Sequence, residues 1–410
     1  MTHSPSQLPP LQPLHVIERC LSSFEYYHAS VGRHPAAVLR PREVIAIVEG
    51  RLTGAVPDWQ AALNVVVAQH PGCRLRLSGD RWQAHWTSDG LSPALRQLPD
   101  VDWDGRSSQG DEFIYATPLS LEEGPTCELI VAGRGEHTKV IFRALHAVMD
   151  GLGAIHFLLD FFRALRGEPL QGCNAAYSDV DLMRHLPSQR PSYDRGSPVT
   201  LDAADVSAPP GGRWCRITLP GPQHHLIPRI ARLVARHARQ QTGASLAPVR
   251  IALPVSLKRH VPELLSTANF TNMVYLEVAP EATNEQLHAQ FQGLLKQNVD
   301  AHYPRIFSAI RALPLRWLDR LLSPTGRNYT RRKVLETAVL SVLGPFRKVA
   351  FSGGGFQAEA LYGVPQKEST FIVAIGFQGR YELTIGMAHL YASAGRLEAF
   401  VAELEQQLKA

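Results

Sequence analysis

The chain has 410 residues, 45% of them hydrophobic and 8% aromatic, and a formal net charge of +5 at pH 7. This length suits two to three domains, or two large ones, and 31 glycines with 30 prolines are near average usage, which excludes a low-complexity protein. The mildly basic charge suits an acidic partner, such as a phosphate-bearing cosubstrate or a carrier protein, but is too diffuse to indicate nucleic acid.

The sequence carries no clear signal for export, for a membrane span or for a cysteine-based metal site. Residues 1–14 lack the basic and apolar regions of a signal peptide, and we expect a flexible polar arm there. Since no stretch reaches the ~18 apolar residues that span a membrane, we expect a soluble, cytoplasmic protein. The cysteines are scattered and form no CxxC pair, which predicts reduced, buried thiols and no structural zinc. They are Cys20, Cys73, Cys127, Cys173 and Cys215.

The first half of the chain alternates strand-like and helix-like segments. Apolar residues recur at helical spacing in 58–69, after Asp58 as N-cap, and again from 155 to 165, where Gly167 and Pro169 end the helix. Expected strands are 43–52, 73–77, 81–86, 127–133 and 138–145, with the second and third forming a hairpin around 78–80.

Residues 171–213 are rich in Pro, Ser, Asp and Gly and show little periodicity. We assign 176–213 as a linker between an N-terminal half, 15–175, and a C-terminal half, 214–410. The expected strands of the second half are 214–219, 249–255, 270–278, 335–343, 370–377 and 380–388, and the expected helices are 224–241, 284–300, 305–322 and a closing helix over 397–408. Two α/β halves of similar size therefore follow one another.

His146 ends the expected strand 138–145 and precedes Asp150 and Gly151 in one short loop. A lone buried histidine is most often a core residue, and Asp150 suits the N-cap of the following helix. A histidine fixed between a strand end and a capped helix, with an ordinary pKa of about 6.5, also suits a general base at neutral pH. Asp150 is not spaced to polarise the ring, and we expect an ion pair with an arginine to tie the loop down.

The run HAVMDG (146–151) matches the HxxxDG motif and resembles the chloramphenicol acetyltransferase-like superfamily. This superfamily includes condensation domains of nonribosomal peptide synthetases, plant BAHD acyltransferases, wax ester synthases and polyketide-associated acyltransferases. Further segments resemble its patterns in the expected order: AQHPGCRLRL (68–77), ALRGEPL (164–170), ALPVSLKR (252–259) with ANFTNMV (268–274), and LSVLG (340–344).

The sequence also departs from the family patterns. Leu145 stands where condensation domains usually carry a first histidine, and Ala268 and Val342 replace a usual Gly and Asn. The DFGWG signature of the plant enzymes is absent, since FSGGGF (351–356) does not match it. The chain therefore most resembles stand-alone, single-histidine acyltransferases.

The resemblance implies a layered α/β (α+β) fold in which two halves form a pseudo-dimer around a central tunnel, with His146 midway. It implies an acyltransferase that moves an acyl group from acyl-CoA or a phosphopantetheinyl thioester to an alcohol or amine, while His146 deprotonates or orients the acceptor. No cofactor would bind tightly, and the chain would act as a monomer in natural-product or lipid biosynthesis. The alternatives are a stand-alone condensation enzyme that forms an amide from substrates on acyl or peptidyl carrier proteins, and a non-catalytic docking module.

Other polar residues are weaker candidates for the site. No GxSxG elbow marks a covalent nucleophile, and Asn269, Ser341 and Ser352 are the candidates for oxyanion or substrate contacts. His156 would need a third ligand, which the sequence does not show, to form a metal site. We therefore predict a packing role for His156 and no metal.

Two basic segments could serve as docking surfaces. One face of the expected helix 224–241 carries Arg229, Arg232, Arg236 and Arg239. The segment 303–333 carries eight further basic residues against the single acid Asp319, and leucines and Trp317 alternate with them. A solvated face is one reading, and a dock for coenzyme A phosphates or an acidic carrier protein is the other. The second segment also suits peripheral contact with lipid.

Overall fold

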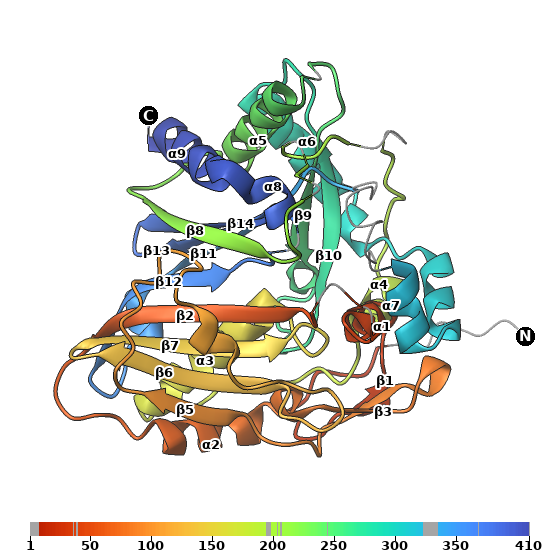
Figure 1. The fold of residues 1–410 in the computed structure, drawn as a ribbon. Helices are drawn as coiled ribbons and strands as arrows, with labels where there is room; N and C mark the ends of the chain where they lie inside the picture. The colour runs from red at the N-terminus through yellow and green to blue at the C-terminus, as the bar shows by residue number, and fades with distance from the viewer. Residues whose placement is uncertain are drawn as a thin grey trace, which may run out of the picture.

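The computed structural model describes residues 8–35, 37, 40–193, 198–202, 204–205, 207–243, 245–322, 335–367 and 369–409. It has the two α/β halves that the sequence predicts, one above the other in Figure 1, each built around its own sheet. Within the described part of the chain, no helix combines the length and apolar composition needed to cross a bilayer.

The N-terminal half is built on a five-stranded sheet in which the inner strand β2 (Glu43–Leu52) contributes buried side chains on both faces. Ala46 and Val48 join one hydrophobic cluster with α3 (Gly151–Leu165), while Ile45 and Ile47 join another on the opposite face, because successive side chains alternate along a strand. The strand order is β12 (Phe356–Val364), β2, β7 (His137–Leu145), β6 (Cys127–Arg134) and β5 (Ala94–Leu98).

The expected hairpin is present but shorter than predicted. Its strands are β3 (Arg76–Ser78) and β4 (His85–Thr87), which form a small sheet with β1 (Glu18–Cys20). Residues 71–74 form a 3-10 helix instead of a strand, with Pro71 at its first position, where a missing N–H costs nothing. Helix α2 (Trp59–Gln69) begins after Asp58, whose side chain accepts from Ala61 N–H, as predicted.

The C-terminal half is built on a six-stranded sheet covered by three helices, α5 (Leu226–Thr242), α6 (Asn284–Lys296) and α9 (Arg396–Lys409). Their apolar faces and the sheet share one cluster. The strand order is β10 (Thr271–Glu277), β9 (Arg250–Ser256), β11 (Ala338–Phe346), β13 (Phe371–Phe377), β14 (Arg380–Ala388) and β8 (Gly212–Leu219).

Strand β12 was not predicted, and it connects the two halves. It follows β11 in the sequence but pairs antiparallel with β2 in the sheet of the N-terminal half. The approach is so close at Gly50 that a Cβ there would lie 2.2 Å from the carbonyl oxygen of Gln357. The two halves of the sequence therefore do not correspond to two separate sheets.

The described residues of the linker and of the N-terminal arm, from residue 8 on, are more ordered than expected. The linker contains α4 (Asp179–His185), which begins with a capping box between Ser178 and Asp181 and buries Leu182 and Met183. In the expected flexible arm, Gln12 and Leu14 donate backbone hydrogen bonds to residues 174 and 173. Leu182 and Met183 belong to one hydrophobic cluster, on which Leu8 and Leu11 of the arm also pack.

The predicted helix 305–322 is divided into a 3-10 helix (Arg305–Ala312) and α7 (Leu315–Leu322). Proline 314 separates them because it has no N–H to continue the first helix. Helix α7 packs on α1 (Ser23–Ser30), buries Leu315 and Leu318, and exposes Trp317 and Leu321. The predicted basic residues Arg327, Arg331, Arg332 and Lys333 lie outside the described residues.

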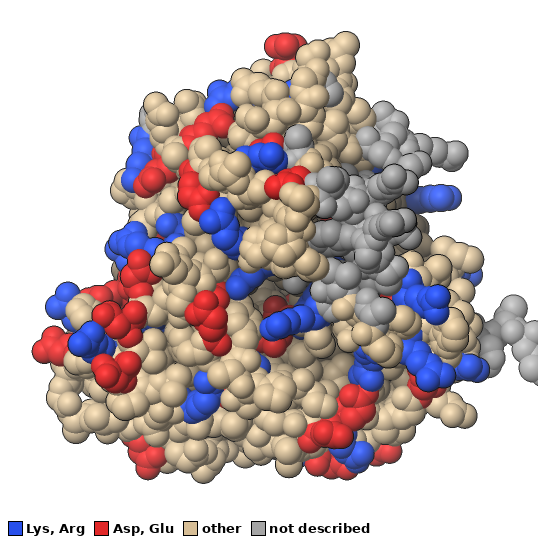
Figure 2. All heavy atoms as spheres, in the orientation of Figure 1, with Lys and Arg blue, Asp and Glu red and all other residues tan. Residues whose placement is uncertain are grey.

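Basic and acidic side chains are mixed on the surface (Figure 2), and the cysteines form no disulfide. Figure 2 shows Lys and Arg interspersed with Asp and Glu over the face in view, in keeping with the diffuse charge of the sequence. All five cysteines are free thiols, as expected. Three of them are buried, whereas Cys215 is half-buried and Cys20 is exposed, so the expectation of burial is wrong for Cys20.

Candidate active site

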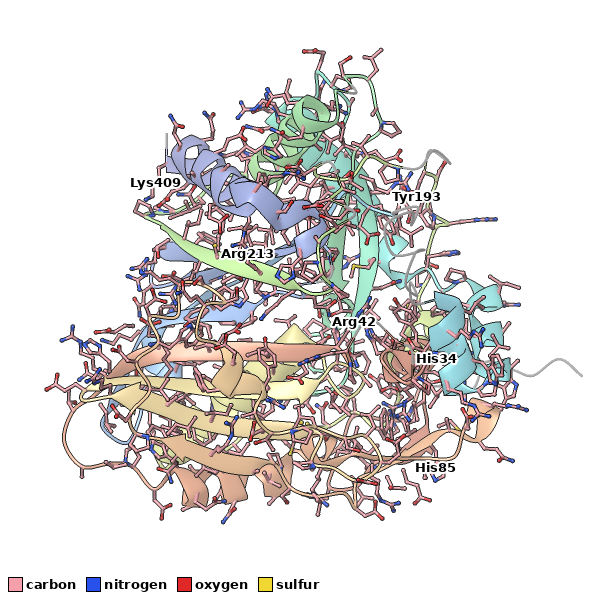
Figure 3. All side chains as sticks on the ribbon, in the orientation of Figure 1. His34, Arg42, His85, Tyr193, Arg213 and Lys409 are labelled. Atoms are coloured by element: carbon pink, nitrogen blue, oxygen red, sulfur yellow. The ribbon has the colours of Figure 1, made fainter. Side chains whose placement is uncertain are left out.

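The motif loop begins where β7 ends and stops where α3 begins. The backbone N–H of His146 donates to the carbonyl of Arg42 (2.8 Å), which ties the loop to the residues before β2. Figure 3 labels Arg42 where the two halves meet. At Gly153, in the first turn of α3, a Cβ would lie 2.0 Å from the carbonyl oxygen of Thr267. A glycine at this position thus lets the C-terminal half approach the motif.

Asp150 caps α3 and also connects the two halves. Its Oδ1 accepts the N–H of Gly153 (2.7 Å), as the N-cap prediction requires. Its Oδ2 accepts the N–H of Phe270 (2.9 Å) and the hydroxyl of Thr271 (2.7 Å). The expected ion pair with an arginine is wrong: among the described residues, a backbone amide and a hydroxyl of the C-terminal half hold the carboxylate instead.

Asn269 fixes the tautomer of His146. Its side-chain Nδ2 donates to the backbone carbonyls of His146 (2.9 Å) and Ala147 (3.2 Å). Because a carbonyl only accepts, these bonds orient the amide with Oδ1 toward His146 Nδ1, 3.2 Å away. The Nδ1 atom must then carry the proton, and Nε2 keeps a lone pair. Asn269 therefore orients the ring, and since both its N–H groups are used, it is not the oxyanion donor proposed from the sequence.

The surroundings of His146 keep its ring neutral. Burial lowers the pKa of His146 below its ordinary value of 6.5, and the positive charge of Arg42 lowers it further. Hydrogen bonds from the ring to its own backbone and to Asn269 act in the opposite direction but do not outweigh burial. The free-base form, which can accept a proton, is therefore favoured at neutral pH.

A second histidine, which the sequence analysis missed, stacks on the first. His28 lies on α1, and its ring is nearly parallel to that of His146, with 4.2 Å between centroids and 11° between planes. Burial, followed by the charges of His146 and Arg42, lowers the pKa of His28 well below 6.5. The segment SFEYYHAS carries no motif that marks His28, because the contact exists only once α1 has packed against the loop.

A pocket of about 200 Å³ lies beside these rings. His28 and Arg42 line it, together with the two neighbours of His146 in sequence, Leu145 and Ala147. Residues 119–122 line it as well. The ring of His28 therefore separates two environments, with the His146 ring stacked on it and a small pocket beside it.

The two serine candidates lie in different places. Ser341, on β11, shares a strand face with Leu343, and a Cβ on Gly151 would lie 3.9 Å from Leu343. Ser341 thus remains a candidate for substrate contact. Ser352 lies beside Arg166, which donates to its carbonyl (2.6 Å) just past the far end of α3. By the helix rise this is about 22 Å from the motif, which excludes Ser352 from contact with an acyl group at His146.

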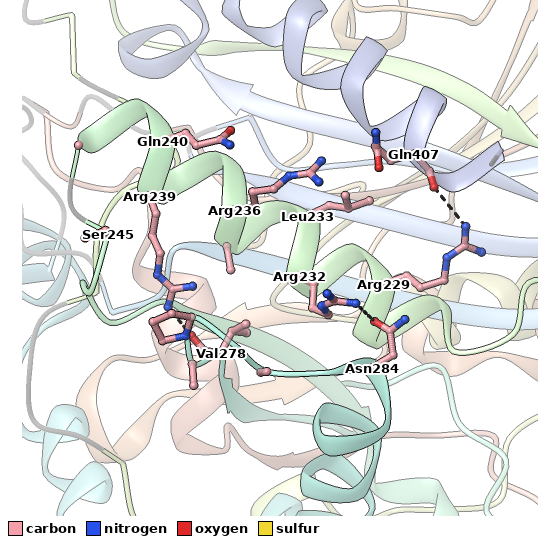
Figure 4. Close-up of a pocket in the computed structure, with 15 residues that line it drawn as sticks. Arg229, Arg232, Leu233, Arg236, Arg239, Gln240, Ser245, Val278, Asn284 and Gln407 are labelled. Carbon is pink, nitrogen blue, oxygen red and sulfur yellow. Dashed lines mark hydrogen bonds between the residues drawn. The ribbon is translucent and has the colours of Figure 1, made fainter.

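The four arginines of α5 line one pocket, of about 660 Å³, at the outer side of the C-terminal half (Figure 4). The sequence prediction that they share a face is therefore confirmed. Their guanidinium groups are already engaged. The partners are the carbonyls of 407–408 for Arg229, Asn284 for Arg232, Glu403 for Arg236, and the carbonyls of 247 and 278 for Arg239. Arg232 and Arg236 are exposed, and docking at this pocket stays a prediction.

Comparison with known proteins is informative at the level of structure. No protein-family model matches the sequence, and no curated protein matches it. Solved structures of condensation domains do match over nearly the whole chain. A double variant of the starter condensation domain of rhizomide synthetase RzmA, in complex with C8-CoA, superposes with a TM-score of 0.67 at 15% identity and covers 96% of this chain and 94% of that chain.

Two further structures agree with this match. The same domain in complex with C8-CoA and Leu-SNAC gives a TM-score of 0.66 at 14% identity, covering 96% of this chain and 93% of that one. The condensation domain of the monacolin K polyketide synthase MokA gives 0.60 at 14% identity, covering 97% and 98%. At such low identities the likeness shows the fold, which is the two-lobed pseudo-dimer expected from the sequence.

Proposed function

We propose that this chain, whose fold is that of the chloramphenicol acetyltransferase-like superfamily and its condensation domains, is an acyltransferase. It would move an acyl group from a thioester donor to an alcohol or amine acceptor. The observation that carries this proposal is the fixed tautomer of His146, with Nδ1–H held by Asn269 and Nε2 free as a base.

The chemistry needs no covalent enzyme intermediate. As the acceptor oxygen or nitrogen attacks the thioester carbonyl carbon, Nε2 of His146 takes the acceptor's proton. The tetrahedral intermediate then collapses, the C–S bond breaks, and the leaving thiolate takes the proton back from the imidazolium. General-base help of this kind is worth on the order of 10²–10⁴ in rate, and holding the acceptor beside the ring adds a positioning term.

Two features bear on the substrates. The RzmA neighbours were crystallised with C8-CoA, one of them also with Leu-SNAC, which supports a thioester donor here and favours an amine acceptor. Amide formation from carrier-bound substrates, as in a stand-alone condensation enzyme, is the second candidate function. The exposed Arg232 and Arg236 would then contact the acidic surface of a carrier protein.

In either case we propose a role in natural-product or lipid biosynthesis, carried out in the cytoplasm by a monomer.

The test is thiol release from a panel of acyl-CoA and acyl-carrier-protein donors, with and without amines and alcohols. We expect His146→Ala to slow release by at least 10²-fold. Asn269→Leu should cause a smaller loss because the base remains but its tautomer is no longer fixed. His225→Ala, an exposed histidine at the start of α5, is the control and should match the wild type.

The outcomes separate the candidates. Release from CoA donors that disappears in His146→Ala supports a free-standing acyl-CoA-dependent transferase. Release only from carrier-bound donors supports the condensation enzyme. If folded His146→Ala protein releases thiol as fast as wild type, or neither protein releases it with any acceptor, the proposal fails and the chain is a docking module.

A further inference from the structure

Three buried side chains with metal-binding atoms meet in the N-terminal half, although they are far apart in the sequence. His70 ends α2, His156 lies on α3, and Cys173 lies between α3 and the linker. One ligand atom from each lies within 4.8 Å of the others. Their exposed fractions are 0%, 8% and 6%. The site is therefore enclosed, and none of these residues takes part in the proposed acyl transfer.

Hydrogen bonds on the outer side of both rings fix their orientation. The Nε2–H of His70 donates to Asp160 Oδ2 (2.8 Å), and the Nε2–H of His156 donates to the carbonyl of Gly172 (2.7 Å). Each imidazole therefore keeps its Nδ1 as the atom able to bind a cation. Metal-bound histidines characteristically donate their other ring N–H to a carboxylate or a backbone carbonyl in this way.

Two of the ligand atoms, those of His70 and Cys173, are spaced as two ligands of one zinc ion are. His70 Nδ1 lies 3.5 Å from Cys173 Sγ. With Zn–N of about 2.0–2.1 Å and Zn–S of about 2.3 Å at tetrahedral angles, a nitrogen and a sulfur ligand lie about 3.6 Å apart. Two imidazoles and one thiolate are ligands that zinc prefers.

Asp160 organises the site from behind. Besides His70, its carboxylate accepts the backbone N–H groups of Gln171 (3.0 Å) and Gly172 (2.8 Å). These amides belong to the two residues directly before Cys173. One buried carboxylate thus fixes both the His70 ring and the position of the thiol.

Without a metal, a proton takes the place of the cation. Burial by itself lowers the pKa of His70, but hydrogen bonds with Asp160 and Cys173 raise it to about 9, and the Arg163 side chain lies 3.8 Å from Asp160. A metal ion would therefore have to displace a proton from this cluster.

We propose that His70, His156 and Cys173 bind a single Zn²⁺ ion, while Asp160 orients the His70 ring by accepting its Nε2–H. The ion would join the end of α2, the middle of α3 and the segment around Cys173. It would thereby hold the chain that leads into the linker against the N-terminal half. The proposal departs from the sequence prediction of no metal, because the folded chain brings candidate ligands close to His156 that the sequence did not show.

The test is a titration of the full-length, metal-stripped protein with Co²⁺, followed by displacement with Zn²⁺. We expect one equivalent of Co²⁺ to bind, with the thiolate-to-cobalt absorption band of a cysteine ligand, and Zn²⁺ to abolish the band. Cys173→Ser should lose the band, whereas Cys127→Ser, a buried thiol outside the cluster, should keep it. Asp160→Asn should weaken binding 10–100-fold.

Each outcome bears on the proposal. If Cys173→Ser does not fold, His156→Gln serves in its place, because this ligand is the most exposed of the three; it should bind Co²⁺ at least tenfold more weakly. No uptake by the wild type would mean that the cluster holds only a proton, shared between imidazole and thiolate, and would overturn the proposal. Equal uptake by wild type and Cys173→Ser would overturn it as well. None of these readouts depends on acyl transfer.

Discussion

The chemistry available to His146 depends on three neighbours that hold different parts of the residue. The Arg42 carbonyl binds its backbone N–H, Asn269 holds Nδ1, and His28 covers one face of the ring. A histidine with this many constraints has one tautomer and one orientation. The remaining variable is its protonation, which pH controls.

The pH dependence should follow the lowered pKa of His146. Because the neutral ring is the base, activity should persist as pH falls through 6.5 and decline only at lower pH. In Arg42→Gln the positive charge that lowers this pKa is gone, so the acid limb of kcat/KM should shift to higher pH. The measurement is kcat/KM against pH for both proteins.

The control for this prediction is Arg51→Gln, on strand β2, which begins directly after Arg42. Arg51 is half exposed and pairs with Glu359, so its replacement should leave the acid limb unchanged. An acid limb that stays in place in Arg42→Gln, or that already lies above pH 6.5 in the wild type, would contradict the account of His146 given by burial and charge.

At the scale of elements, α1 acts on the site through the ring of His28. We expect His28→Phe to retain most of kcat because the stacked ring remains. His28→Ala should lower kcat about tenfold or more, since the His146 ring loses its support and small misplacements of a catalytic group are costly. Steady-state kinetics with the preferred donor would measure both. Equal losses in the two variants would instead indicate that the nitrogen atoms of His28 matter, not its stacking.

Elements with strong local signals could be predicted from the sequence. Strand β2 and helices α2 and α3 have unbroken apolar periodicity, and Asp58 and Asp150 cap the two helices through hydrogen bonds three residues along the chain. Strand β12 could not be predicted in this way, because its pairing partner β2 lies at the other end of the sequence.

The same limit applies to the site. His146 and Asp150 share a loop, so their juxtaposition is encoded locally. Asn269 lies 123 residues from His146, and its motif identified it as a site residue without revealing that it orients the ring. The His28 stack, like the cluster around Cys173, arises only from tertiary packing, and no local pattern indicates either.

At the scale of the whole molecule, the carboxylate of Asp150 holds the halves together. Asp150→Ala would leave buried donors at Gly153 and Phe270 without an acceptor, and the residue itself is only 3% exposed. We expect a loss of about 3–5 kcal/mol in the free energy of unfolding, from the cap and the charged hydrogen bonds together.

Thr271→Val provides the matched comparison, because it removes one hydroxyl donor to the same carboxylate. It should cost only about 1 kcal/mol. Urea denaturation of both variants, followed by fluorescence, measures the difference. Similar small losses in the two proteins would show that Asp150 does not hold the halves together.

The path of β12 has a consequence for recombination between relatives of this chain. A chimera joined at the end of the linker would take residues 1–213 from one parent and 214–410 from another. Strand β12 at the edge of the first sheet would then come from the second parent. That strand must fit Gly50, where even one added carbon atom would collide with the backbone of Gln357. Functional chimeras should therefore inherit 356–364 together with the first half, and a productive exchange of the second half needs two junctions in the gene rather than one.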